Sequence, residues 1–583
     1  MITKITPLTR LPSKIDSFDY FVGHEFREKI KIGQLVTIPW RNKKTQGVVL
    51  SLESSPSFPR RGLVQRPYEA LAKEGGGVGI VDNKKTFRAR PITEILDDNP
   101  ILTKEQFELI KKFSDYYFCS KGYVARLMTP EKLKLKTKFN ELKFEDHKFS
   151  ISKNQLEELQ KLRLPEKINS NQTIVIQDVS SFIWLILHLA KYTKGQMVVL
   201  FPTIDLINSV ASIVHKKCSG KLAVIHSQLN KGNYWNEYQK VLSRKAKIIL
   251  STRQGVFLPI QKQSKIIFFE SSSQDFKQYD QNPRYDARIV ASWLSKITNS
   301  DLIFTSSSIP LNKKFINLPL SSNIKTSIKL VDMKTEMQKK DFSIIADSTI
   351  NSIKRAIQNN KKIIIISLRE DSIQGVSVKK IAEVLTNQIK NCKIATEYGA
   401  NQNFDVLITT AYSLEALKLS QERAKFSLAV FSSIEPLLAI PDFRGGIRTF
   451  NRLNFWKIMC QELQIEHIIL QSYSSDNLAI RAFAYGETDW FIDSELKHRK
   501  ELSYPPFFQL IKLWHKGNEK NEFDRALKLL RFELKDKAKI LGPFQDKKDK
   551  QSLLLKVKNN TDLKTLCSLS QDWVVDRDPE NIL

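Results

Sequence analysis

The chain has few cysteines, and none of them is spaced like a metal ligand. The five cysteines are far apart and form no C-x-x-C pair, and the histidines show no ligand spacing either. Zinc ribbons and disulfide frameworks both need closely or regularly spaced cysteines, so the pattern argues against both. We therefore predict no metal site and expect most of the cysteines to be small buried hydrophobic residues. They are Cys119, Cys218, Cys392, Cys460 and Cys567.

Long apolar segments are also missing. No run of about 18 apolar residues occurs, which is the length that a membrane-spanning helix needs. The N-terminal sequence MITKITPLTR lacks the apolar region of a signal peptide. We therefore predict a soluble cytoplasmic protein without a membrane partner. Because the chain has 583 residues, a single core is not expected, and the length favours about three to five domains.

Acidic residues are scarce relative to basic ones. The chain has 92 Lys and Arg against 62 Asp and Glu, which gives a net charge of +30. Such a charge usually indicates a polyanionic partner, most often nucleic acid. The alternative cause of the high charge is a genome-wide bias toward lysine, although the numbers of Asp and Glu have not increased in step with that of Lys. Each basic cluster alone suits a solvated face, but together the clusters favour binding to a nucleic-acid backbone. The clusters lie at 41–44, 60–66, 132–138, 216–221, 497–500 and 547–550.

The first 98 residues are predicted to form a β-rich domain. Short apolar runs alternate with turns there, and 51–86 is expected to be a loop insertion. The glycine cluster at 75–79 does not open a helix, so it predicts a flexible linker rather than a phosphate loop. The predicted strands are Phe18–Phe21, Leu35–Trp40, Gly47–Leu50 and Arg88–Leu96.

Residues 99–168 are predicted to form a winged-helix-like or linker region. Thr103 and Gln106 form a capping box that starts a helix running to Phe118. A further helix is expected at Asn154–Leu164, and the lysine-rich stretch between these helices shows little periodicity.

From Thr173 onward, short β-branched runs alternate with helical patterns, which is typical of doubly wound parallel sheets. The pattern predicts two tandem lobes, 169–320 and 321–478, followed by a small α+β domain at 479–583. The predicted fold class is therefore multidomain α/β. The predicted strands are Met197–Phe201, Leu222–His226, Lys247–Ser251, Ile266–Phe269, Leu302–Thr305, Ile328–Met333, Lys361–Ser367, Lys393–Thr396, Val406–Thr410, Ser427–Phe431, His467–Gln471, Ile511–His515, Ser552–Val557 and Trp573–Val575.

The first strand, turn and helix of this region lie where nucleotide-binding α/β proteins place a phosphate loop. We expect the strand at Thr173–Ile176, a polar turn at Gln177–Ser181 and a helix at Phe182–Tyr192. A phosphate loop needs glycines, a Lys and a Ser or Thr, and none of them stands in the expected place. No Gly-x-x-x-x-Gly-Lys-Ser/Thr motif occurs elsewhere in the chain.

Several short strings, taken in their order along the chain, resemble the primosomal protein N-prime family. This family comprises the bacterial replication-restart helicases of superfamily 2, and the resemblance covers nearly the full chain. It implies a domain that binds the 3′ end of DNA at 1–98, a winged helix, two helicase lobes, a zinc-binding insertion and a C-terminal DNA-binding domain. The strings include Phe18-Asp19-Tyr20, Ser251–Phe257, Lys277-Gln278-Tyr279, Pro283–Arg288, Pro441–Arg444, Tyr504–Phe507, Leu541-Gly542-Pro543 and Asp576–Pro579.

Compared with this family, the nucleotide site is degenerate. The family's phosphate-binding Lys and Mg²⁺-binding Thr fall on Ile183 and Trp184, just after Ser180 and Ser181. The metal-binding Asp falls on Phe269, and the adjacent carboxylate is kept as Glu270. The arginine-finger motif is replaced by 454–459, and the zinc-binding insertion expected between 367 and 375 is missing.

These losses predict an inactive ATPase, because phosphoryl transfer depends on positioning and on charge stabilisation by Lys, Mg²⁺ and Arg. No cofactor is then expected. A second hypothesis is an active 3′→5′ helicase that uses ATP and Mg²⁺ through other residues. A third is a protein–protein scaffold with residual DNA binding.

The family's DNA contacts are better retained. By matching motif, Phe18 stacks on the terminal base, Asp19 accepts a hydrogen bond from the 3′ hydroxyl and Tyr20 packs beneath. A family glycine falls on Arg41, which makes the shape of this pocket an open question, and Arg90 is expected to contact phosphate. The expected contacts in the two lobes are Arg253, Lys277, Tyr279, Arg284, Tyr285, Phe443, Arg444 and Arg448.

The resulting prediction is a protein of replication restart that binds DNA forks, single strands and 3′ ends, without unwinding them. Other primosome or helicase-loading proteins are possible partners. The loop at 276–285 suits a single-strand grip, although a purely structural role is the alternative.

Overall fold

The structure is a computed structural model. The predicted helix at 154–164, apart from residue 157, and the basic clusters at 60–66, 132–138 and 547–550 lie outside the residues it describes. Those residues are 1–9, 15–53, 78–82, 85–130, 157, 173–176, 179–218, 221–307, 309–311, 315–317, 325–339, 342–371, 375–396, 403–411, 425–439, 442–517, 520–545, 551–559, 561–563, 565–566, 569, 572–580 and 582.

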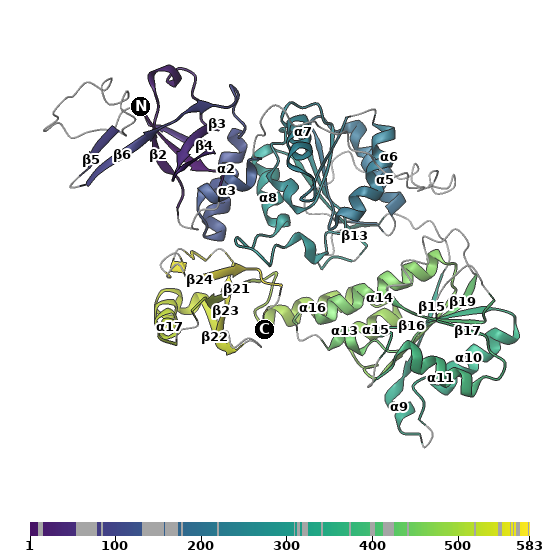
Figure 1. The fold of residues 1–583 in the computed structure, drawn as a ribbon. Helices are drawn as coiled ribbons and strands as arrows, with labels where there is room; N and C mark the ends of the chain where they lie inside the picture. Colours follow the sequence, from purple (N-terminus) through teal and green to yellow (C-terminus); the bar gives the residue numbers. More distant parts are fainter. Residues whose placement is uncertain are drawn as a thin grey trace.

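Four β-sheets organise the chain, and two of them are wholly parallel sheets flanked by helices (Figure 1). This arrangement confirms the predicted multidomain α/β fold class. The central parallel strands are short runs of β-branched and other apolar residues that are buried on both faces. Within the described ranges, none of the helices combines the length and apolar character that crossing a membrane requires.

The N-terminal sheet has seven strands in the order β5-β6-β2-β1-β4-β3-β7. The predicted loop insertion at 51–86 is wrong at both ends, since strands occupy its first and last residues, including two residues of the glycine cluster. The single strand predicted at 88–96 is two strands that pair with different neighbours. The elements are β1 (Ile2–Pro7), β2 (Phe18–Phe21), β3 (Leu35–Trp40), β4 (Lys43–Glu53), β5 (Val78–Asp82), β6 (Lys85–Pro91), β7 (Glu94–Ile95), α2 (Lys104–Tyr117) and α3 (Lys121–Met128).

Helices α2 and α3 pack on the first lobe. Thr103 and Gln106 form the predicted capping box, and the Gln106 amide also donates to the carbonyl of Phe257 at 2.8 Å. The Tyr238 hydroxyl of the first lobe donates to the carbonyls of Ile101 and Met128. One continuous apolar core therefore joins these two helices to the first lobe.

The first lobe has the strand order β10-β11-β9-β12-β13-β8-β14, all parallel. Its first helix begins at Val179 rather than Phe182, so Ser180 and Ser181 lie in the helix and not in a turn. The elements are β8 (Thr173–Val175), α5 (Val179–Tyr192), β9 (Met197–Leu200), α6 (Ile204–Lys217), β10 (Leu222–Ile225), α7 (Lys231–Leu242), β11 (Ile248–Ser251), β12 (Lys265–Phe268), α8 (Ala287–Thr298), β13 (Asp301–Ser306) and β14 (Phe315–Asn317).

The second lobe has the order β15-β20-β19-β16-β18-β17, again parallel. Helices α15 (Leu478–Tyr485) and α16 (Thr488–Glu501) were expected in the C-terminal domain, but buried residues of both belong to the core of this lobe. The elements are β15 (Ser327–Asp332), α9 (Met333–Met337), α10 (Asp347–Gln358), β16 (Lys362–Ser367), α11 (Val378–Gln388), β17 (Ile394–Ala395), β18 (Val406–Thr410), β19 (Phe426–Phe431), α13 (Glu435–Leu438), α14 (Gly445–Glu462), β20 (His467–Ser472), α15 (Leu478–Tyr485) and α16 (Thr488–Glu501).

The C-terminal domain is an antiparallel sheet, β22-β23-β21-β24, with one helix on it. Its edge strand β22 was not predicted, because the Gly542-Pro543 pair in its centre is typical of a turn. The elements are β21 (Phe508–His515), α17 (Lys520–Leu534), β22 (Ala538–Gln545), β23 (Gln551–Lys558) and β24 (Trp573–Arg577).

A buried ion pair docks this sheet on the first lobe. The Lys277 ammonium is fully buried and donates to the Asp576 carboxylate at 2.8 Å and to the carbonyls of Arg284 and Arg577 at 2.5 Å. The Arg577 guanidinium lies 3.7 Å from the ring centroid of Tyr116 in α2. A buried ammonium requires such partners, so strand β24 is held where it lies.

Replacing this lysine is therefore expected to loosen β24. Lys277→Met leaves the Asp576 carboxylate buried and unpaired, which costs about 3–5 kcal/mol. Hydrogen exchange of peptides from β21 and β24, followed by mass spectrometry, should accelerate accordingly. The double variant Lys277→Met/Asp576→Leu should recover most of the protection. As a control, Lys516→Met breaks an exposed 3.8 Å pair with Asp572 and should change exchange little. Unchanged exchange in Lys277→Met would contradict the structural role.

Candidate nucleic-acid interface

Strand β2 carries an aromatic ring and a carboxylate at consecutive positions near the surface of the N-terminal domain. Phe18 is half-buried, and its ring lies 4.7 Å from that of Trp40 in an edge-to-face contact. Asp19 is exposed, because successive residues of a strand point to opposite faces. Tyr20 is buried, its hydroxyl donates to the Pro39 carbonyl at 3.3 Å, and burial raises its pKa to about 12. Tyr20 therefore supports this surface from beneath and does not itself face a ligand.

The turn after β3 has the backbone shape of a glycine turn. Arg41 has φ of +52°, in the left-handed region that favours glycine. The guanidinium of Arg90 donates to the Arg41 carbonyl at 2.8 Å and so supports this conformation. The side chains of Arg41 and Arg90 are exposed, and they lie next to the strands that carry Phe18 and Trp40. The arginine at the family's glycine position thus keeps the turn and adds a cation at the surface.

The aromatic and basic loop of the first lobe is mostly used in domain contacts. Lys277, predicted to bind DNA, has no exposed surface, and this prediction is wrong for the described conformation. Tyr285 is also buried, with its ring 5.0 Å from that of Phe257. Arg284 lies over the Trp514 ring at 4.8 Å, and Arg253 donates to the Asp275 carbonyl at 3.2 Å.

Tyr279 is the member of this loop that remains at the surface. Its side chain is 59% exposed, so a base could stack on it. The predicted single-strand grip is therefore reduced to Tyr279 and the partly exposed arginines on either side.

The predicted contacts in the second lobe hold the C-terminal segment. The Phe443 ring stacks on Tyr504 at 4.5 Å with an interplanar angle of 5°. Arg444 and Arg448 each bind both Asp442 and Glu580, at distances between 2.8 and 3.2 Å. These arginines are neutralised by carboxylates, which the sequence alone did not indicate, so their side chains are not available cations in this conformation.

Apolar side chains fill the carboxyl-terminal edge of the first lobe, where a phosphate loop would lie. Phe182 is fully buried, and its ring lies 4.4 Å from that of Phe269 at the end of β12. Ile183 and Trp184 are 3% and 8% exposed, and Trp184 stacks on His188 at 4.9 Å. From Val179 to Trp184 the helix carries no charged residue. A phosphate group would meet no cation on this turn.

Glu270 is the remaining carboxylate at this edge. It accepts hydrogen bonds from the Ser307 amide at 3.1 Å and the Ser307 hydroxyl at 3.0 Å. Burial raises its pKa from 4.5 to about 7, and the bonds from Ser307 only partly oppose that shift. Among the described residues, no group of three or more His, Cys, Asp or Glu could hold a metal ion. One carboxylate already bound to Ser307 does not make a Mg²⁺ site, so Mg²⁺–ATP does not fit these residues.

Several functional residues were missed by reasoning from the sequence. Trp40 pairs with Phe18, and Asp576 and Glu580 bind the cations that had been assigned to DNA. The charges of the 576–580 segment were visible as a signal, but nothing in the sequence showed which of the many lysines and arginines they would meet.

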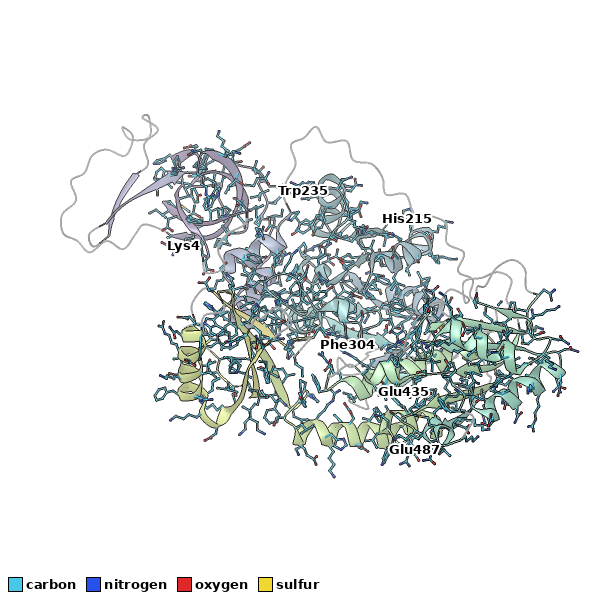
Figure 2. The ribbon with its side chains drawn as sticks, turned by 60° about the horizontal axis from the view of Figure 1, so that its bottom comes forward. Lys4, His215, Trp235, Phe304, Glu435 and Glu487 are labelled. Carbon is cyan, nitrogen blue, oxygen red and sulfur yellow. The ribbon has the colours of Figure 1, made fainter. Side chains whose placement is uncertain are left out.

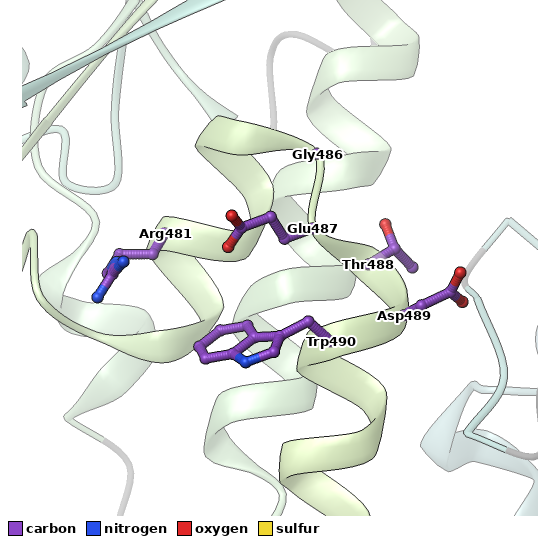
Figure 3. Close-up of a pocket in the computed structure, with 6 residues that line it drawn as sticks. All are labelled: Arg481, Gly486, Glu487, Thr488, Asp489 and Trp490. Atoms are coloured by element: carbon purple, nitrogen blue, oxygen red, sulfur yellow. The ribbon is translucent and has the colours of Figure 1, made fainter.

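A cavity of about 490 Å³ lies at the elbow between α15 and α16 (Figure 3). Figure 3 shows the Glu487 carboxylate and the Trp490 indole extending toward the side on which Arg481 lies, whereas Asp489 extends to the other side. Its carboxylates, Glu487 and Asp489, do not suit a phosphate backbone. This cavity is therefore not part of the candidate interface.

Known proteins of one kind resemble this chain. Residues 10–130 match the model of the PriA 3′ DNA-binding domain. The replication restart protein PriA of Rickettsia prowazekii is 23% identical over 91% of this chain and 90% of its own length. The chain is therefore similar to PriA replication restart proteins over most of its length. PriA is the short name of primosomal protein N-prime, so the resemblance seen in the sequence is confirmed.

Other PriA proteins match shorter parts of the chain. The PriA of Thermotoga maritima is 21% identical over 60% of this chain and 57% of its own length. Among solved structures, RecG bound to a three-way DNA junction matches with a TM-score of 0.33 and 11% identity, over 61% of this chain and 50% of RecG.

The raised pKa of Glu270 predicts a pH dependence of stability. The folded protein holds this proton more tightly than the unfolded chain, whose carboxyl titrates near 4.5. Stability should therefore fall as the pH rises from about 4.5 through 7, and the loss should be complete above that range. Glu270→Gln removes this ionisation, so it should gain on the order of 1–3 kcal/mol relative to the parent protein between pH 5 and pH 8.

Denaturant unfolding of both proteins at the two pH values tests this expectation. Asp275→Asn, a nearby exposed carboxylate, is the control and should show no such relative gain. An equal difference between Glu270→Gln and the parent at both pH values would contradict the raised pKa.

Proposed function

We propose that this PriA-like protein binds DNA forks and free 3′ ends in replication restart without hydrolysing ATP. The observation that supports the proposal most is the contrast between two sites. The N-terminal surface keeps a half-buried aromatic ring, an exposed carboxylate and two exposed arginines, whereas apolar side chains occupy the edge expected for the nucleotide. Such a protein would act as a scaffold at forks, and other primosome or helicase-loading proteins are its proposed partners.

The chemistry of phosphoryl transfer supports the loss of hydrolysis. The transferred phosphoryl group needs a Lys, a Mg²⁺ ion and an Arg to stabilise its charge. Ile183, Trp184 and Phe269 stand at the first two of these positions, and all three are buried. Trp456, in the segment that replaces the arginine-finger motif, is buried in the core of the second lobe.

The contacts between the lobes support a static protein rather than a motor. Glu580 binds Arg444 and Arg448 of the second lobe and lies 3.9 Å from Arg288 of the first. A motor must change the arrangement of its lobes in each cycle, and these bonds would have to break each time.

Nucleotide and DNA are expected to act differently on the purified protein. ATP turnover with forked DNA should stay at background, and ATP with Mg²⁺ should not raise the thermal unfolding midpoint. A fork with a free 3′ hydroxyl should raise it, because a ligand that binds only the folded state stabilises it. Stimulated turnover or ATP-dependent strand displacement would support the active helicase instead. Weak binding that ignores fork structure would support the protein–protein scaffold.

Asp19 is expected to distinguish a 3′ hydroxyl from a 3′ phosphate. A hydrogen bond to a charged group is worth about 1.5–3 kcal/mol, so Asp19→Ala should weaken binding to a fork with a 3′ hydroxyl by roughly tenfold or more. Binding to a 3′-phosphorylated fork should not fall, because the removed carboxylate repels that phosphate. Fluorescence anisotropy with both forks measures the two affinities.

Glu28→Ala is the matched control for this measurement. It removes an exposed carboxylate from the same domain and should not change the ratio of the two affinities. Equal losses on both forks in Asp19→Ala would discard the assignment of Asp19 to the 3′ hydroxyl.

A further inference from the structure

The two edges of the first-lobe sheet differ in charge. The difference is seen in the six residues before and the six residues after each of the strands β9 to β13. The residues after the strands, at the carboxyl-terminal edge, include two cations, Lys231 and Arg253, and two acids, Asp205 and Glu270. The residues before the strands, at the amino-terminal edge, include no acid and ten cations. These are Lys191, Lys194, Lys216, Lys217, Lys221, Arg244, Lys245, Lys247, Lys262 and Lys296.

The five segments that carry these ten cations are neighbours, because they are hydrogen-bonded side by side. The ammonium of Lys247 donates to the Gly195 carbonyl at 2.8 Å, and the backbone amide of Lys247 donates to the Lys221 carbonyl at 2.8 Å. The Gly195 amide donates to the Gln263 carbonyl at 3.1 Å, and the Ser264 amide donates to the Ser300 hydroxyl at 3.0 Å. All ten side chains except Lys247 are exposed. We call this surface the basic edge.

Helix geometry alone does not account for the basic edge. Helix C-termini lie at this end of a parallel sheet, and cations are favoured there. The second lobe has the same geometry, yet the six residues before each of its six strands include six cations and four acids. They are Lys325, Lys361, Lys390, Lys393, Arg423 and Lys425, with Asp405, Glu422, Glu462 and Glu466.

The acids that lie near the basic edge leave it strongly positive. Asp301, the first residue of β13, pairs with Lys265 at 2.5 Å, and Glu105 of α2 pairs with Lys262 at 3.5 Å. Glu105, Lys262 and Arg244 line a groove of about 350 Å³ where α2 meets the lobe. The basic edge is therefore continuous with the helix that carries the N-terminal domain.

The basic edge faces away from the second lobe. Lys277 and Arg288, near the opposite edge, contact the C-terminal segment that also binds the second lobe. Figure 2 shows His215, the neighbour of Lys216 at the end of α6, on the side of the first lobe remote from Glu435 and Glu487. Among the described residues, α2 meets this face at Lys262, and the contacts of the second lobe and the C-terminal sheet lie elsewhere.

We propose that the basic edge binds the phosphates of one double-stranded arm of a DNA fork. This inference rests on the proposed function and adds a duplex-binding surface to it. Five neighbouring strands span roughly 19 Å at about 4.8 Å per strand. That length of duplex carries about 11 phosphate charges, comparable with the number of cations on the edge.

The composition of the edge favours duplex DNA over other polyanions. Single-strand sites use several aromatic rings for stacking, and the five segments contain one aromatic residue, Tyr192. Protein interfaces place apolar and aromatic anchors at their centre and deplete lysine there. A lysine-rich face without such anchors suits contacts to a phosphate backbone.

A pair of triple charge reversals tests the proposal. Lys221→Glu/Arg244→Glu/Lys245→Glu changes the basic edge, and Lys325→Glu/Lys361→Glu/Lys390→Glu makes the same change of charge on the equivalent edge of the second lobe. All six side chains are exposed, so both variants should keep the parent's thermal unfolding midpoint. Anisotropy titrations over a series of KCl concentrations use a fork with duplex arms and a single strand with the same 3′ hydroxyl end.

The edge variant should bind the fork about tenfold or more weakly, and the slope of log K against log salt should fall by about 3. Its affinity for the single strand and the affinities of the control variant should stay within about twofold of the parent. The neutral variant Lys221→Gln/Arg244→Gln/Lys245→Gln should show a smaller loss in the same direction.

Three outcomes would overturn the proposal. Equal losses in the edge and control variants would show an effect of net charge alone. An equal loss on the single strand would show a single-strand site, and unchanged fork binding would leave the edge to another polyanion, such as an acidic protein. ATP turnover by the parent protein would overturn the proposed function and leave these comparisons intact.

Discussion

The fully buried ammonium of Lys277 is the interaction on which the arrangement of the domains depends. A charge without solvent must have acceptors all around it, and here the C-terminal strand supplies two of them. Because those acceptors lie about 300 residues away in the sequence, the ammonium is satisfied only when the first lobe and the C-terminal sheet are docked. Glu580, three residues beyond Arg577, then reaches the second lobe through Arg444 and Arg448. The short segment from 576 to 580 thus joins α2 and both lobes.

Because of this docking, the residues that a helicase would use to sense DNA make contacts within the protein instead. Lys277, Arg444 and Arg448 have carboxylate partners, and Tyr285 is part of the core. The nucleotide edge has a similar character, since Phe182 and Phe269 pack there in place of polar groups. Burying each such side chain contributes about 1.5–3 kcal/mol to the free energy of folding. A phosphate loop without bound nucleotide instead leaves a space that water must fill. Both changes favour one stable arrangement over a cycle of several.

The sequence predicted the repeating architecture well, because each buried parallel strand is a local apolar run that needs no knowledge of its neighbours. The burial of Ile183 and Trp184 was also predictable, since neither side chain has a polar role at that place. The first turn of α5 was misread because Ser180 and Ser181 are polar, although burial in the lobe offsets their low helix propensity. Residues such as Arg444 were misassigned for another reason. Their charge is visible in the sequence, but one of the two carboxylates that neutralise Arg444, Glu580, lies 136 residues away.

The charge of the first lobe can be compared with what its helices require. Four helices end at the amino-terminal edge of the sheet, and each C-terminus carries about half a negative charge, so about two cations would balance them. The ten present exceed that number, and Glu105, which pairs with Lys262 at 3.5 Å, offsets only part of the surplus. Lys247 shows the cost, because partial burial and then the neighbouring Lys221 lower its pKa. A fold that needed only its own stability could place acids here, as the second lobe does with Asp405 and Glu466. The surplus is compensated only when an anionic partner is bound, so the charge of this edge is explained by binding rather than by folding.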